Sequence, residues 1–227
     1  MPWRLIPLVT GEYYHTYNRG INKQPIFQDA RDYKRFLELI EFCSFDDNRI
    51  RYSYFKRLSL EQRENILTSL REKNTQLVDN LCFVLMPNHF HFLVKQNEVN
   101  GISRFMSKLQ NSYTRYFNEK YKKLGPLLQG YFKSVWVEDD SQLLHLSRYI
   151  HLNPITSYVT KDVEDLEKYQ WSSYMEYLGK KSNVICKNKT ILSQFQTITD
   201  YQQFVNDRIE YQRKLDRIRH LVLEEAD

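Results

Sequence analysis

Two histidines, His89 and His91, stand one residue apart in the segment FVLMPNHFHFLVKQ, residues 83–96. This segment is rich in aliphatic and aromatic residues and therefore predicts a β-strand. Because side chains alternate between the faces of a strand, both histidines point to one face while Phe90 and Phe92 point to the core. The two imidazoles, about 7 Å apart along the strand, can reach one cation. A histidine pair of this kind is also common on plain strand surfaces, so the pair alone leaves both interpretations open.

A second pair of chemically useful residues stands in SRYIHLNP, residues 147–154, which predicts a helix. Tyr149 and Asn153 are four residues apart and therefore share one helical face. A tyrosine hydroxyl that has lost its proton is a nucleophile, and a divalent cation that polarises a phosphate lowers the barrier to its attack. Two imidazoles and one amide oxygen leave positions open for phosphate oxygens, which suits Mn²⁺ or Mg²⁺ better than structural zinc. Alternatively, Tyr149 packs on the core and Asn153 caps the helix before Pro154.

Other residues near these pairs have simpler interpretations. His151 lies about 200° around the helix from Tyr149, so packing or hydrogen bonding is expected for it. Tyr113 and Tyr116 are rival nucleophiles because they lie in a basic predicted helix. A zinc hydrolase built on the two histidines would need a further acidic ligand, and the nearby Asp139 stands at a helix start, where capping explains it.

The elements that must position these residues follow from periodicity and from turn residues. Asp29 and Ser59 are the predicted N-caps of two helices. The predicted strands are 13–21, 51–58, 77–96 with a break at Pro87, and 127–139, and the predicted helices are 29–43, 59–74, 101–123, 140–153 stopped by Pro154, and 199–223. This alternation predicts an α+β fold, a ferredoxin-like (RRM-like) antiparallel sheet with helices packed on one face, followed by a C-terminal helical extension.

Composition sets limits on the class of protein. With 227 residues, of which 41% are hydrophobic, the chain can bury a sizeable core, which excludes a disordered protein. Its three cysteines form no CxxC pair and predict reduced, intracellular thiols. The N-terminus lacks the features of a signal peptide, and no window approaches eighteen apolar residues. We therefore expect a cytoplasmic protein with no membrane partner.

Positive charge is concentrated in residues 104–133, although the net charge of the whole chain is only +5. Glu119 is the one acidic residue of this stretch, and its basic residues are Arg104, Lys108, Arg115, Lys120, Lys122, Lys123 and Lys133. Tyr113, Tyr116, Phe117 and Tyr121 lie among them, and cations beside aromatic rings suit phosphates and unstacked bases. The alternative is a solvated helix face whose rings lie in the core. Arg104, Lys108 and Arg115 fall within one broad helical face and are the better phosphate candidates of the helix. On the first strand and its exit, His15 and Arg19 could reach DNA, and the alternative for both is a contact on the sheet surface.

Several motifs together resemble a known family. PNHFHFLV, LQGYFKS, RYIHLNP and YQWSSYMEYLG, with the early YYHTYNRGINKQPIF, are similar to those of the REP-associated tyrosine transposases. These enzymes belong to the single-tyrosine HUH transposases of the IS200-like family, where U is a bulky hydrophobic residue. The resemblance covers about residues 10–180.

The resemblance implies a ferredoxin-like domain that binds hairpin-forming repeats and cuts single-stranded DNA. It implies that His89, His91 and Asn153 hold a divalent metal, Mg²⁺ or Mn²⁺, and that Tyr149 is the nucleophile. Attack by Tyr149 would give a 5′-phosphotyrosine intermediate and a free 3′ hydroxyl, which can later reverse the step at another end. Relatives often carry a basic residue near the position of Tyr131, and here that DNA contact is expected to be lost or to move to Lys133. The residues predicted to bind DNA are Arg19, Arg104, Lys108, Arg115 and Lys133.

We therefore expect a transposase domain over residues 1–180, with 59–74 as a helical insertion, and a C-terminal extension over 181–227. The expected function is a metal-dependent single-stranded DNA endonuclease and strand transferase. The alternative is a catalytically inactive hairpin-binding protein derived from a transposase. The sequence is compatible with a monomer or a homodimer.

Overall fold

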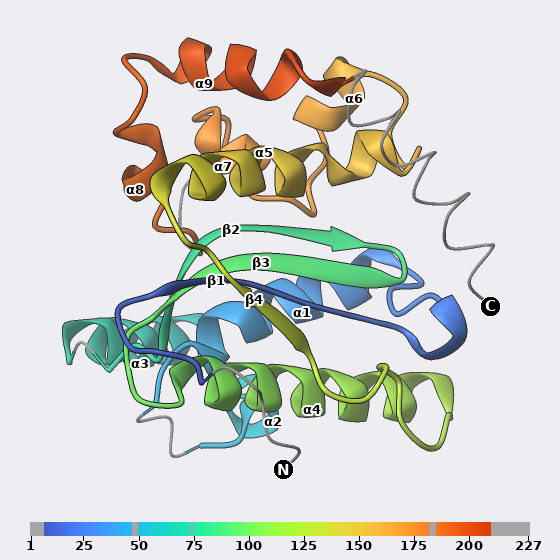
Figure 1. The fold of residues 1–227 in the computed structure, drawn as a ribbon. Helices are drawn as coiled ribbons and strands as arrows, with labels where there is room; N and C mark the ends of the chain where they lie inside the picture. The colour runs from blue at the N-terminus through green and yellow to red at the C-terminus, as the bar shows by residue number, and fades with distance from the viewer. Residues whose placement is uncertain (1–6, 47–49, 74, 182–184, 210–227) are drawn as a thin grey trace. The chain divides into compact units, whose positions relative to one another are not determined.

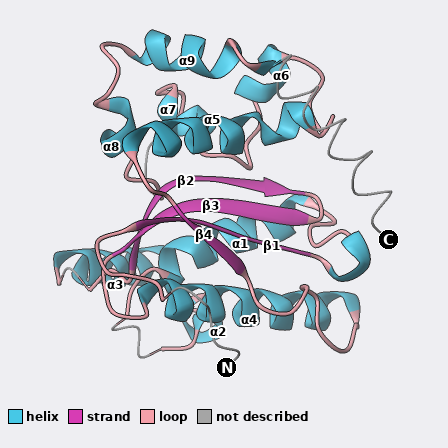
Figure 2. Ribbon diagram, viewed as in Figure 1, coloured by secondary structure: helices cyan, strands magenta, loops and turns pink. Residues whose placement is uncertain are grey.

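The computed structural model describes residues 7–46, 50–73, 75–181 and 185–209. Figure 1 traces the chain through them, and Figure 2 distinguishes helices from strands. The elements are β1 (Tyr13–Arg19), the short 3-10 helix η1 (Ile21–Lys23), α1 (Ala30–Cys43), α2 (Tyr52–Phe55), α3 (Leu60–Glu72), β2 (Val78–Met86), β3 (His89–Gln96), α4 (Gly101–Tyr121), β4 (Lys133–Trp136), α5 (Asp140–Thr156), α6 (Val163–Glu167), α7 (Tyr174–Tyr177), α8 (Lys189–Leu192) and α9 (Ile198–Asn206).

The strands form one four-stranded sheet in the order β2-β3-β1-β4. Without α2 and α3, the elements follow the order β-α-β-β-α-β, which is the ferredoxin-like arrangement. The predicted α+β fold with an antiparallel sheet is therefore confirmed. Because β4 is at one end of the strand order, it is an edge strand.

Contacts divide the chain into two compact units, which we describe separately. The first contains Met1–Asp79, Pro87–His89 and Val94–Trp136, and the second contains Asn80–Met86, Phe90–Leu93 and Val137–Asp227. In the first unit, helices α1 and α4 pack together. Phe36 is fully buried between them and meets the rings of Phe27 and Tyr113 edge-on. The buried face of β1 joins this core, since Thr16 contacts the sulfur of Met106 and Asn18 donates to Gln110.

The helix starts behave as their sequences predict. Asp29 accepts from the backbone amides of Arg31 and Asp32, and Ser59 accepts from the amide of Gln62. In both helices the residue at the third position also bonds back to the cap, forming a capping box. The helix predicted over 59–74 is therefore present as α3.

The predicted strand over 51–58 is wrong, because this segment contains the helix α2. Tyr52 and Phe55 are both buried and pack on the ring of Phe42, while Tyr54 is exposed. Buried residues three apart fit one face of a helix and not one face of a strand. The aromatic residues of this segment favoured a strand. Packing of both Tyr52 and Phe55 on Phe42 instead needs the residue spacing of a helix.

Two helix and strand boundaries also differ from prediction. Helix α5 does not stop at Pro154 but continues to Thr156. The proline oxygen accepts from the amides of Val159 and Thr160, so the chain beyond the helix end is bonded back onto it. Of the strand predicted over 127–139, only β4 is formed. The last predicted helix begins as α9, and its part beyond residue 209 lies outside the described residues.

Candidate active site

β3 carries both candidate metal-binding histidines, and its first residue is His89. The turn before it is fixed at Pro87, whose carbonyl oxygen accepts from the amides of Ile26 and Phe27. Asn88 donates through Nδ2 to the carbonyl of Lys23, which leaves its Oδ1 as the acceptor for Nδ1 of His89 at 2.7 Å. A neutral imidazole that donates through Nδ1 has a lone pair on Nε2, the form in which it can ligate a metal. Asn88 thus orients the first histidine.

Arg19 lies across from His89 on the neighbouring strand. Two backbone bonds fix this register, since Gly20 N donates to Asn88 O at 2.8 Å and Gln96 N donates to Glu12 O at 3.0 Å. Arg19 is exposed, and its Nε donates to Gln129 at 2.6 Å. A side chain at Gly20 would meet the carbonyl oxygen of Gln24 at 2.2 Å, so glycine is needed where the chain leaves the strand. The predicted DNA-binding arginine therefore adjoins the first candidate metal ligand.

In the second unit, His91 meets Tyr149 of α5. The two ring centroids are 5.7 Å apart and the rings are nearly perpendicular, at 86°. His91 is buried at 7% exposure, whereas Tyr149 is half-buried. Two residues far apart in the sequence are therefore brought into ring contact, as a shared site requires.

Asn153 follows Tyr149 by one helical turn and is 4% exposed. It does not cap the helix, because the C-cap of α5 is Ser157. The alternative interpretation of Asn153 as a cap before proline is therefore wrong. The amide lies in a buried place on the helix that carries the candidate nucleophile, where a ligand would be shielded from bulk water.

The histidine-bearing face of β3 is more covered than its sequence suggests. We expected Phe90 and Phe92 to be buried, and they are, but Leu93 on the opposite face is also fully buried. Two-sided burial arises because the segment Phe90–Leu93 joins the compact unit that contains α5. A strand that is buried on both faces has a nearly continuous apolar sequence. The sequence therefore does not show what packs on its second face.

His151 holds α5 in place. Its Nδ1 lies 2.7 Å from the hydroxyl of Tyr201, and its Nε2 lies 2.8 Å from the hydroxyl of Ser173. Ser173 in turn bonds the backbone of Phe83 in β2, accepting from its amide and donating to its carbonyl. Complete burial lowers the pKa of His151 to about 3, so the imidazole is neutral. The expected hydrogen bonding of His151 is confirmed, but the roles of Ser173 and Tyr201 carry no signal in the sequence.

Tyr113 and Tyr116, the rival candidates for the nucleophile, both form hydrogen bonds within the first unit. The Tyr113 hydroxyl is buried and donates to the carbonyl of Ile26 at 2.5 Å, and burial raises its pKa. The Tyr116 hydroxyl donates to the carboxylate of Asp32 at 3.0 Å, and burial together with this bond raises its pKa. Raised pKa values oppose formation of the phenolate. Neither residue therefore suits the role of nucleophile.

The predicted phosphate-binding residues fall into two groups. Arg104 forms an ion pair with Asp46, and Lys108 lies 3.6 Å from the same carboxylate, so part of their charge is neutralised. Lys133 is exposed on the edge strand β4, and Arg115 is exposed on α4. These two have no ion pair among those found in the described part of the chain.

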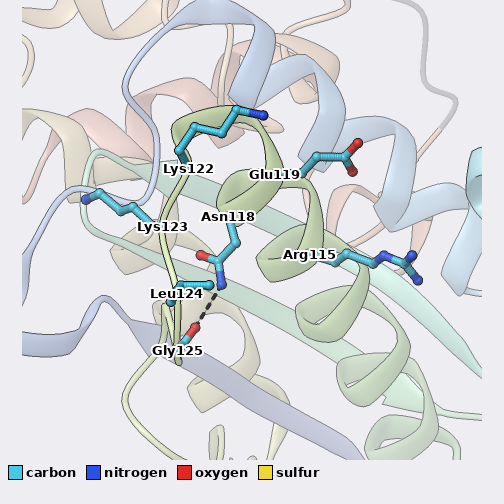
Figure 3. Close-up of a pocket in the computed structure, with 7 residues that line it drawn as sticks. All are labelled: Arg115, Asn118, Glu119, Lys122, Lys123, Leu124 and Gly125. Carbon is cyan, nitrogen blue, oxygen red and sulfur yellow. Dashed lines mark hydrogen bonds between the residues drawn. The ribbon is translucent and has the colours of Figure 1, made fainter.

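Arg115 lines an open hollow at the end of α4, shown in Figure 3. The hollow measures about 650 Å³, and its other lining residues are Asn118, Glu119, Lys122, Lys123, Leu124 and Gly125. The side chains of Arg115, Lys122 and Lys123 point in different directions, and the one bond drawn joins Asn118 to the carbonyl of Gly125 at 2.8 Å. The hollow is therefore a basic surface that can attract an anion. Its donors do not converge on one point, so they do not form a specific anion-binding site.

Within the described residues, no group of three or more histidine, cysteine, aspartate or glutamate side chains could hold a metal. The ligands predicted from the sequence are His89, His91 and the amide of Asn153. Imidazole nitrogen and amide oxygen are donors that divalent cations such as Mn²⁺ accept. The neutral donor set thus fits a cation that binds together with a phosphate.

Comparison with known proteins is informative at this point. Residues 47–153 match the family model described as Transposase IS200 like. Over these residues the chain is similar to the IS200-like transposases. The IS200-like region contains His89, His91 and Tyr149, and it ends at Asn153. This match agrees with the resemblance carried by the sequence motifs.

The fold of the chain is also similar to that of a solved structure. The chain is similar to a REP-associated tyrosine transposase bound to a REP hairpin, with a TM-score of 0.52, 13% identity, and coverage of 82% of this chain and 89% of that chain. A similarity to tRNA(His) guanylyltransferase from Saccharomyces cerevisiae has a TM-score of 0.36 and 9% identity over 95% and 80% of the two chains, and it supports no argument. No curated protein sequence matches the chain significantly. In the described part of the chain, no helix is both long and apolar enough to cross a bilayer.

Proposed function

We propose that the protein is a metal-dependent endonuclease and strand transferase that acts on single-stranded DNA at hairpin-forming repeats. The observation that carries this proposal is the ring contact between His91 and Tyr149, one helical turn before the buried Asn153. All three residues lie in the region that matches the IS200-like family. The hairpin substrate is suggested by the REP hairpin bound to the structural relative.

Tyr149 is the proposed nucleophile. Its hydroxyl oxygen attacks the phosphorus of the scissile phosphodiester, the phenolic proton leaves, and the bond from phosphorus to the 3′ oxygen breaks. The 3′ oxygen takes up a proton, and the 5′ phosphate stays attached to the tyrosine. Attack by a 3′ hydroxyl on this phosphotyrosine reverses the step and transfers the strand.

His89, His91 and Asn153 are the proposed ligands of a divalent cation, Mg²⁺ or Mn²⁺. When bound, such a cation supplies Lewis-acid stabilisation of charge on the phosphate oxygens. Asn88 contributes by holding the His89 ring with Nε2 available, and His151 contributes by fixing α5 to β2. Both are positioning residues.

DNA binding is proposed for Arg19, Arg104, Lys108, Arg115 and Lys133. For Arg19 the proposal is supported by its position opposite His89 across β1 and β3. Arg104 and Lys108 share Asp46 and are expected to contribute less than the exposed Arg115 and Lys133. These contacts bind the backbone and carry no sequence information by themselves.

Covalent trapping tests the proposed activity. The protein is incubated with a labelled hairpin oligonucleotide and Mn²⁺, and a complex that survives denaturation is sought on a gel. We expect an adduct with the natural chain and none with Tyr149→Phe, because the variant lacks the nucleophilic oxygen. Tyr54→Phe, which changes an exposed tyrosine of α2, is the control and keeps the adduct.

The alternative, an inactive hairpin-binding protein, predicts a different pattern. An inactive hairpin-binding protein would form no adduct with any cation, and a chelator would not change its affinity for the hairpin. An adduct that persists in Tyr149→Phe would show instead that another residue is the nucleophile.

A further inference from the structure

β1 presents a row of three rings on one face of the sheet. Tyr13, His15 and Tyr17 occupy alternate positions and are all half-buried. The residues between them, among them Tyr14 and Thr16, are buried toward α4 and the core. Because alternate residues of a strand are about 7 Å apart, the rings form a regular line along the strand. We name Tyr13, His15 and Tyr17 the β1 ring row.

Two rings of the row, His15 and Tyr17, already stack on each other. The centroids of His15 and Tyr17 are 4.9 Å apart, and their planes differ by 29°. At the other end of the row, Nζ of Lys95 lies 5.7 Å from the centre of the Tyr13 ring. A base could add to this stack at its outer faces, and at Tyr13 it would find a cation beside the ring.

Basic residues flank the row on both neighbouring strands. Tyr17 pairs with Lys133 of β4, and directly paired residues of an antiparallel sheet lie on the same face. Lys95 lies on β3, and Arg19 continues the row by one further alternate position. Lys133 is exposed, and Lys95 is half-buried. The row is therefore bordered by charges of the sign that phosphates require.

The row ends beside the candidate metal ligand. The register that places Arg19 opposite His89 also places Tyr13 opposite Lys95, at the far end of β3. His89 and Lys95 occupy alternate positions of one strand and so share a face with the ring row. A strand of DNA lying along β1 would thus lead from Tyr13 to Arg19 and His89.

We propose that the β1 ring row is a stacking surface for unpaired bases of the DNA strand, with Lys95, Lys133 and Arg19 at its phosphates. The ligand is the single-stranded flank of a hairpin, and the row orders that flank along the sheet. This inference rests on the proposed function, because it gives the row the same DNA substrate. Stacking on aromatic side chains tolerates any base, so the row supplies affinity and direction and leaves sequence choice to other contacts.

The test compares variants that keep or remove the aromatic face. Tyr13→Leu/Tyr17→Leu retains apolar volume but has no π-face, whereas Tyr13→Phe/Tyr17→Phe retains the face and loses only the hydroxyls. The Kd is measured for two oligonucleotides, one a hairpin with an unpaired flank and the other the same hairpin with blunt ends. The Tyr149→Phe background is used for all variants, so that no cleavage occurs.

We expect the leucine pair to weaken binding of the flanked hairpin by at least about 10-fold, since each stacked base contributes about 1–3 kcal/mol. Binding of the blunt hairpin is unchanged, and the phenylalanine pair binds both as the parent does. A 2-aminopurine in the flank reports stacking directly, because its fluorescence is quenched by the parent and by the phenylalanine pair and recovers with the leucine pair. Thermal unfolding of the leucine pair near the parent Tm shows that the fold is intact.

Equal affinity of parent and leucine pair for the flanked hairpin would overturn the stacking surface, as would an equal loss for the blunt hairpin. An RNA flank that binds more tightly than DNA would overturn DNA as the ligand. Failure of the proposed function is seen separately, as absence of an adduct in the natural chain.

Discussion

At the residue scale, Glu176 is a buried carboxyl outside the proposed site. It is 4% exposed, and its Oε2 is without a hydrogen-bond partner among those found in the described part of the chain. Burial raises its pKa to about 7, although the charge of Lys181 and a bond from the Cys186 backbone act in the opposite direction. The folded state therefore binds this proton more tightly than the unfolded state does, for which the pKa is 4.5.

The sign of the pH dependence follows from this difference. Between pH 4.5 and 7 the folded chain holds more protons at Glu176 than the unfolded chain, so its contribution to stability falls as the pH rises. The loss is complete above pH 7 and amounts to roughly 3 kcal/mol. We expect Glu176→Gln to be about that much more stable relative to the natural chain at pH 8 than at pH 5. Urea unfolding of both proteins at the two pH values measures the change, and an identical pH dependence in the variant would contradict it.

At the scale of elements, Asp32 joins the start of α1 to the end of α4. Its fully buried carboxylate accepts from Lys120 at 2.6 Å, from the hydroxyls of Tyr116 and Tyr121, and from the backbone amide of Gln28. Burial opposes ionisation, but these bonds prevail and lower the pKa of Asp32. The carboxylate is therefore charged and fully engaged at neutral pH.

Removal of this carboxylate is expected to be far more damaging than loss of an ordinary helix cap. Asp32→Ala leaves Lys120 and two phenols without their acceptor, and breaking a buried ion pair from one side costs about 3–5 kcal/mol. The matched control is Asp200→Ala, because Asp200 has the same capping-box position in α9 but is exposed. A loss of about 1 kcal/mol is expected for the control. Chemical denaturation measures both, and similar losses would show that the network adds little beyond capping.

At the scale of the whole molecule, the distribution of paired and unpaired cations determines how DNA binding responds to salt. Each phosphate contact that is lost lowers the slope of log K against log salt concentration by about 1. Arg115 is exposed at the basic hollow, whereas Arg104 is already paired with Asp46. We expect Arg115→Gln to reduce the slope by about 1 and Arg104→Gln to reduce it by less. Hairpin affinity measured over a range of salt concentrations tests this, and a larger effect of Arg104→Gln would reverse the proposed ranking.

The sequence by itself determined the features that depend on local periodicity. The histidine strand, the helix with Tyr149 and Asn153, and the caps Asp29 and Ser59 were all predictable, because side-chain alternation and capping involve residues close in the chain. The resemblance to the IS200-like transposases followed from the same short motifs.

Only the tertiary structure decided which of these residues meet. The contact of His91 with Tyr149, the pairing of Arg104 with Asp46 and the helical form of α2 on Phe42 all join segments that are distant in sequence. The periodicity of the sequence indicates which face of a strand or helix a side chain occupies. It does not indicate which other segment packs on that face. Burial on both sides of β3 and the line of rings on β1 therefore became visible only once the strands and helices were packed.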